Sequence, residues 1–144
     1  MKLILLRGIS GSGKTTWSKK LRGFYPCSAD YYMLVNGVYQ FHPDKLPMAH
    51  TKCQARVKRL LSEGQNVLVD NTNTRDSDLM VYIRMGLDAG AEVEVVTLLC
   101  DPQEAFQRNR HEVPLDTIRH QHENLVASLV TRVPGVTYRV ERSS

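Results

Sequence analysis

The stretch LLRGISGSGKTTW, residues 5–17, decides the fold of this chain. Within it, residues 8–15 match the phosphate-binding pattern G-x-x-x-x-G-K-[ST] at every fixed position. The apolar run at residues 2–6 predicts a buried strand before the pattern, and a helix is expected from Lys14 to Arg22 after it. The pattern thus stands between a strand and a helix, which is the context that a loop for a nucleoside triphosphate requires.

The residues of this loop have separate expected roles. Its glycines let backbone N–H groups point inward at an anion, and the start of the following helix adds positive potential. Lys14 is expected to reach the β and γ phosphates, and the Thr15 hydroxyl is expected to ligate Mg²⁺. ATP with Mg²⁺ is therefore the expected ligand. The residues expected to contact the nucleotide here are Ser10, Gly11, Ser12, Gly13, Lys14, Thr15 and Thr16.

The rest of the chain alternates short apolar runs with helical spacing. Strands are expected over 2–6, 27–29, 66–70, 93–99 and 135–140, and helices over 14–22, 48–63, 79–87 and 115–129, with a further helix starting after Asp101. Asn36-Gly37 predicts a hairpin turn within 33–41. This alternation predicts an α/β P-loop NTPase fold, in which a parallel five-stranded sheet carries helices on both faces. We expect residues 1–144 to form a single domain.

Composition restricts the setting of the protein more than its chemistry. The formal net charge of +4 and a pI near 9.1 suit an anionic substrate, but an ordinary surface would give the same values. Cys27, Cys53 and Cys100 lie far apart and form no CxxC pair, so neither a disulfide nor a zinc site is expected. No run approaches the ~20 apolar residues of a membrane span. A cytoplasmic protein with reduced thiols is expected.

A bound nucleotide can pass its γ-phosphate to water or to an acceptor. Transfer to a hydroxyl needs a carboxylate near the acceptor to take its proton. Asp30 follows the expected second strand and is the candidate base, although a loop aspartate or a helix cap would read the same. Asp70 ends an apolar strand, where it could hold Mg²⁺ or orient the acceptor. Both carboxylates and the glycine loop are expected at the same edge of the sheet.

Two further polar stretches allow two interpretations each. Residues 70–74, DNTNT, offer donors and acceptors to a substrate, but they also suit a plain helix-entry loop capped by Thr74. Residues 108–114, RNRHEVP, could form a short helical lid whose Arg108 and Arg110 close over the phosphates. The alternative is a solvated helix terminus, where basic residues are favoured by the helix dipole.

Taken together, these motifs resemble a known family. The stretches GSGKTTW, FYPCSADYY, DNTN and RNRHEVPLDTIR occur in the order seen in the kinase domain of phage polynucleotide kinase and related P-loop kinase domains. The resemblance spans residues 3–125 and implies transfer of the γ-phosphate of ATP to the 5′-hydroxyl of a nucleic acid, with Mg²⁺. It implies that Lys14 serves ATP, that Asp30 is the general base, and that Arg108 contacts the phosphates.

The resemblance also implies an acceptor side, with one departure. Asp70 and Thr72 match its acceptor motif, and a eukaryotic group of relatives is similar at YQFHPDKLPMAH, which contains His50. Met33 stands where the phage enzyme has an arginine for the acceptor phosphate, so Arg75 or Lys52 would have to replace it. The residues predicted to bind the acceptor are Asp30, His50, Asp70, Thr72, Asn73 and Arg75.

Three functions follow from these residues. The leading one is a polynucleotide 5′-kinase that prepares nucleic-acid ends for repair, with Lys14, Asp30 and Arg108 as catalytic residues and Thr15 and Asp70 at the metal. The second is a kinase of a small hydroxyl substrate, such as a nucleoside, a sugar or a nucleotide-sugar. The third is an ATP-dependent switch or adaptor without transferase activity.

Overall fold

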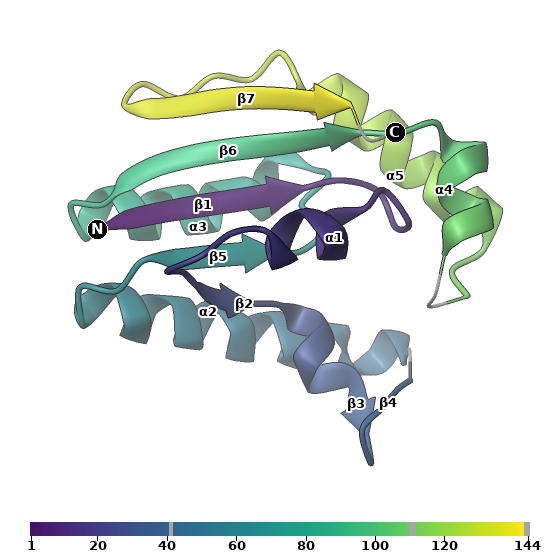
Figure 1. Ribbon diagram of the computed structural model, residues 1–144, viewed down its shortest axis with the longest axis horizontal. Helices are drawn as coiled ribbons and strands as arrows, with labels where there is room; N and C mark the ends of the chain where they lie inside the picture. Colours follow the sequence, from purple (N-terminus) through teal and green to yellow (C-terminus); the bar gives the residue numbers. More distant parts are fainter. Residues whose placement is uncertain (41, 110–111, 143–144) are drawn as a thin grey trace.

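The computed structural model describes residues 1–40, 42–109 and 112–142. Its sheet contains five parallel strands in the order β2-β5-β1-β6-β7, as the sequence predicted. The strands are β1 (Lys2–Arg7), β2 (Tyr25–Cys27), β5 (Val67–Asp70), β6 (Glu92–Leu99) and β7 (Val136–Arg142). In Figure 1 the arrows of β1, β5, β6 and β7 point the same way, toward α4 and α5. Their carboxyl ends therefore share one edge.

Helices cover both faces of this sheet. The α-helices are α1 (Lys14–Lys19), α2 (Leu46–Ser62), α3 (Asp76–Asp88), α4 (Pro102–Arg108) and α5 (Leu115–Ser128). Short 3₁₀ helices η1 (Ala29–Met33) and η2 (Pro43–Lys45) flank the small hairpin of β3 (Leu34–Val35) and β4 (Val38–Tyr39), which turns at Asn36-Gly37 as expected. None of the helices in the described residues is long and apolar enough to cross a membrane.

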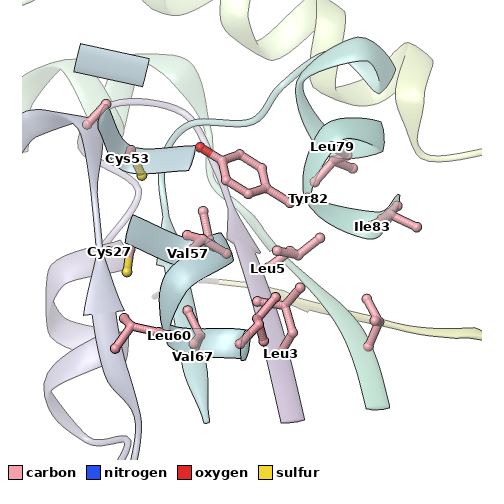
Figure 2. Packing of buried hydrophobic residues seen from close by; sticks show 14 of the residues in the cluster. Leu3, Leu5, Cys27, Cys53, Val57, Leu60, Val67, Leu79, Tyr82 and Ile83 are labelled. Carbon is pink, nitrogen blue, oxygen red and sulfur yellow. The ribbon is translucent and has the colours of Figure 1, made fainter. Parts of the chain in front are cut away.

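Alternate residues of the central strands feed two separate cores. Leu3 and Leu5 of β1 join Val67 of β5 beneath α2 and α3, while Ile4 and Leu6 face the opposite way against Trp17 and its neighbours. Figure 2 shows the first core, where side chains of α2 and α3 meet those of β1 and β5. Because every second residue is buried on each face, the β1 strand is fixed in register at the centre of the sheet.

Two boundaries differ from the sequence prediction. The first helix ends at Lys19 instead of Arg22, because Leu21 and Phe24 leave the helical path to pack on the second core. The second strand covers Tyr25–Cys27 instead of 27–29, since β5 pairs with these residues. Asp30 therefore lies in η1, beyond the strand that was expected to end at it.

Close packing at Gly86 supplies a stability test. A Cβ at this α3 position would lie 2.6 Å from Val93 Cγ2 and 2.7 Å from Leu3 Cδ2. Valine has better helix propensity than glycine, so an unpacked position would gain stability. We expect Gly86→Val to lower the free energy of unfolding by about 1–3 kcal/mol through overpacking. Urea denaturation followed by circular dichroism measures this, and an unchanged or raised midpoint would contradict the packing.

Candidate nucleotide and phosphate-transfer site

The loop between β1 and α1 has the backbone shape of an anion cradle. Gly11 and Gly13 take positive φ angles of 84° and 97°, which residues with side chains rarely adopt. A Cβ on Gly11 would lie 2.0 Å from the Ala105 carbonyl oxygen, because α4 passes directly over the loop. Glycine is thus required here by the backbone and by its neighbour. The loop can turn its N–H groups toward a bound phosphate.

Distant segments hold this loop in place. The Gly8 N–H donates to the Thr72 carbonyl at 3.0 Å, which joins the loop to the segment after β5. The Ser10 N–H donates to Gln121 Oε1 of α5 at 2.9 Å. The Ser12 hydroxyl is buried and has no hydrogen-bond partner in the described part of the chain. The loop therefore offers a polar atom in need of a partner, as expected where a ligand completes the site.

Lys14 is the central cation of the site. Its Nζ donates to the Gly8 carbonyl at 2.9 Å and to the Ile9 carbonyl at 3.2 Å. Burial lowers the pKa of Lys14, and the nearby carboxylates of Asp70 and Asp30 act in the opposite direction. An ammonium that is removed from water and held only by carbonyls and carboxylates is well suited to bind phosphate oxygens.

Asp70 and Thr15 supply oxygen atoms beside this lysine. Burial raises the pKa of Asp70, whereas Lys14 and the Ser18 hydroxyl act in the opposite direction. Thr15 and Thr16 are exposed in the first turn of α1. Mg²⁺ keeps several waters and takes one or two protein oxygens together with phosphates, so a hydroxyl and a carboxylate fit it. The described residues contain no cluster of His, Cys, Asp or Glu that would by itself hold a metal.

Asp30 is exposed and supported on two sides. Its own N–H donates to the Ser28 hydroxyl at 3.2 Å, and the preceding Ala29 N–H donates to Asn71 Oδ1 at 2.8 Å. The Tyr39 hydroxyl, which comes from the β3–β4 hairpin, hydrogen-bonds the Asp30 carboxylate. Burial and this carboxylate raise the pKa of Tyr39 to about 12, so the phenol stays a donor at neutral pH. Lys14, Asp70 and Asp30 are thus brought close enough to interact.

The residues after Asp70 divide into supports and exposed groups. Asn71 is buried and its amide nitrogen faces Tyr82 Oη at 3.5 Å, while Asn73 is 3% exposed and donates to the Leu6 carbonyl at 3.3 Å. The Asn73 amide therefore holds the loop to β1 and does not face an acceptor. Thr74 is buried and is not the cap of α3, since Arg75 is the N-cap residue with its backbone N–H on Asp78.

The other predicted acceptor residues are less closely gathered. Arg75 is exposed and pairs with Asp78 at 3.4 Å, so its guanidinium already has a carboxylate partner. His50 lies half-buried on α2. Met33 is only 4% exposed and belongs to the core beneath α2. It does not point at an acceptor, so the position matched to the family's arginine is a packing position here.

Two of the predicted lid residues lie outside the described residues. Arg108 is the last residue of α4, and its Nη2 donates to Cys100 Sγ at 2.8 Å. Arg110 and His111 belong to the part of the chain for which no structure is described. Asn109 Nδ2 donates to the Val113 carbonyl at 2.8 Å, which draws the two ends of this segment together. Arg108 thus lies on the helix that passes over the glycine loop.

Sequence reasoning missed three residues that support the site. Arg7 is 2% exposed and its Nη2 donates to the Thr74 carbonyl at 3.2 Å, while burial lowers its pKa to about 10. A charged residue at the end of an apolar strand was the available signal for Arg7. Tyr39 and Gln121 act on Asp30 and Ser10 through contacts that span the fold, and no local pattern marks them.

Comparison with known proteins places this site in a family context. The AAA domain family matches residues 3–129. Human NEDD4-binding protein 2 is 29% identical over 97% of this chain, and a mimivirus protein described as a putative bifunctional polynucleotide phosphatase/kinase is 24% identical over 99% of it. The chain spans only 9% and 29% of the lengths of these relatives.

Solved structures share the fold at low sequence identity. A chain of the Pnkp1/Rnl/Hen1 RNA repair complex superposes with a TM-score of 0.74 at 21% identity, covering 88% of this chain and 44% of that one. A gluconokinase from Sinorhizobium meliloti gives a TM-score of 0.62 at 16% identity, covering 99% of this chain and 83% of its own. These likenesses show a P-loop kinase fold, which kinases of different acceptors share.

The position of Lys14 predicts a loss of nucleotide binding on its removal. We expect Lys14→Ala to weaken ATP binding at least tenfold, because a charge-assisted contact contributes about 1.5–3 kcal/mol. Titration with a fluorescent ATP analogue measures this. Lys19→Ala, which removes an exposed lysine of the same helix, is the matched control and should bind normally. Equal affinities in the two variants would contradict the site.

Proposed function

We propose that this chain, which belongs to the AAA domain family, is an ATP-dependent kinase that phosphorylates the 5′-hydroxyl end of a polynucleotide. The observation that carries the proposal is the electrostatic contact of Lys14 with both Asp70 and Asp30. A phosphate-binding cation, a metal-binding carboxylate and a candidate base then share one edge of the sheet. A switch that only binds nucleotide has no need of the third group.

Each residue has a proposed part in the transfer. Lys14 and the N–H groups of the glycine loop bind the phosphates of ATP and orient the γ-phosphate. Thr15 and Asp70 would hold Mg²⁺, which when bound neutralises charge on the phosphates. Asp30 accepts the proton of the acceptor hydroxyl as its oxygen bonds to the γ-phosphorus and the bond to ADP breaks. Arg108 would reach the phosphates from α4.

The hairpin and the asparagine after β5 act as positioning elements in this proposal. Tyr39 and Ser28 each bond to Asp30, and Asn71 holds the backbone at Ala29. A general base must stay within hydrogen-bond reach of the proton that it takes. These supports would restrict the Asp30 carboxylate to one region of the exposed edge.

The nature of the acceptor rests on the relatives and the charge of the chain. The mimivirus relative and the repair-complex chain carry names that refer to polynucleotide or RNA chemistry. The net charge of +4 suits a polyanionic acceptor. A kinase of a small hydroxyl substrate is the second candidate, favoured by the gluconokinase fold and by the burial of Met33, which leaves no cation at that position.

The setting of the protein is part of the proposal. We treat residues 1–144 as one kinase unit, with nucleic acid ends as its partner. Cys27, Cys53 and Cys100 are all buried free thiols, which supports a reducing, cytoplasmic environment.

An acceptor screen tests the proposed reaction. The protein is incubated with γ-labelled ATP, Mg²⁺ and either 5′-hydroxyl DNA and RNA oligonucleotides or a mixture of nucleosides and sugars. We expect label on the oligonucleotides and none on those that already carry a 5′-phosphate. Label confined to the small molecules would favour the second candidate, and no label on any acceptor would favour a switch.

Asp30→Asn tests the base. We expect a fall in the transfer rate of about 10²–10⁴-fold, the usual contribution of a general base, with ATP affinity unchanged. Asp44→Asn is the matched control, because Asp44 is an exposed carboxylate of η2 that the mechanism does not use. Transfer at the control's rate by Asp30→Asn would remove Asp30 from the mechanism.

A further inference from the structure

A basic groove runs along the outer side of α2, away from the glycine loop. It has a volume of about 410 Å³ and is lined by Tyr32, Lys52, Ala55, Arg56 and Arg59. Three of these five residues are cations, and none is acidic. The volume falls in the range of sites that hold small ligands, so a nucleotide-sized group fits.

The three cations form one stripe on the helix. Lys52, Arg56 and Arg59 are four and three residues apart, which is the spacing of neighbours on one helical face. From the first to the last the helix rises about 10 Å, at about 1.5 Å per residue, which matches about three nucleotide steps at 3.4 Å each. A linear series of phosphates can therefore follow the stripe.

The neighbours of these cations leave the groove positive. Lys52 Nζ lies 5.8 Å from the centre of the Tyr32 ring, and Arg56 Nη2 donates to the Pro26 carbonyl at 3.4 Å. The carboxylate near the stripe is Glu63, whose distance to Arg59 is 3.9 Å in an exposed pair. Such exposed pairs contribute little and exchange readily for another anion. Two of the three cations thus face only a ring or a carbonyl.

The groove begins beside the candidate base. Tyr32 belongs to η1, two residues after Asp30, and η1 packs directly on α2. Two residues of a 3₁₀ helix rise about 4 Å. The aromatic ring of Tyr32 thus lies between the base and the stripe, where it can stack on a nucleobase. A strand whose 5′ end is at Asp30 would lead directly into the groove.

We propose that this groove is the track for the acceptor strand, in which Lys52, Arg56 and Arg59 bind successive phosphates downstream of the 5′ end and Tyr32 stacks on a base. The ligand is single-stranded nucleic acid, since a row of cations beside an aromatic ring is the combination that such strands use. The inference rests on the proposed function for its acceptor. It also resolves the choice between Lys52 and Arg75, because Arg75 is paired with Asp78.

The test compares Lys52→Gln/Arg59→Gln with Lys58→Gln. Arg56 is kept because it bonds to Pro26, and Lys58 is an exposed α2 lysine that does not line the groove. Kinetics are measured with a 5′-hydroxyl oligonucleotide of about 12 nucleotides and with a nucleoside 3′-monophosphate. We expect the double variant to raise KM for the long acceptor at least tenfold, with kcat, the KM for ATP and the KM for the monophosphate near wild type.

Binding supplies a readout that does not depend on catalysis. Fluorescence anisotropy of the labelled oligonucleotide between about 50 and 200 mM salt should show a log–log slope smaller by about 2 in the double variant, one per lost phosphate contact. Lys58→Gln should keep the wild-type slope. If no acceptor is phosphorylated but the slope changes as stated, the proposed function fails and the groove stands. Oligonucleotide KM and slope equal to those of Lys58→Gln would overturn the groove, whatever the kinase activity.

Discussion

The buried ammonium of Lys14 is the charge on which the arrangement of the site depends. Removing an ammonium from water is costly, and carbonyls alone compensate poorly for it. The fold supplies Gly8 and Ile9 carbonyls on one side and the Asp70 and Asp30 carboxylates on the other. The same burial that lowers the pKa of Lys14 leaves its charge to be met by an anion. Phosphate oxygens can fill that requirement, and the carboxylates that remain beside them can hold metal or take a proton.

The sheet could be predicted from the sequence because its central strands are short apolar runs closed by glycine or aspartate. Residues 2–6, 66–70 and 93–99 alternate between two cores, and burial on both faces gives near-continuous apolar sequence. The edge strand β2 was misplaced by two residues because Tyr25-Pro26-Cys27 carries little pattern. Its position follows from pairing with β5, which is a tertiary contact that local propensity does not contain.

The site was predictable where the residue type alone determines the chemistry. A lysine after a glycine loop and an aspartate after a buried strand have few other uses. Asparagine and threonine are ambiguous, because a turn and a ligand site require the same groups. The structure assigns Asn73 to the backbone of β1 and Met33 to the core, and it joins Tyr39 to Asp30 across a hairpin. Each of these depends on which segments meet in space.

The same principle explains why the cations of α2 could not be recognised as a group before the fold was known. On a surface helix, lysines and arginines usually cover a solvated face, and their spacing alone does not distinguish a binding stripe from an ordinary one. Packing of η1 against α2 places Tyr32 and the stripe on the same side, with the candidate base two residues from the ring. Lys14 and the α2 cations then lie on either side of Asp30. A reaction that joins two polyanions needs positive charge on both sides of the base, because either anion alone would repel the other.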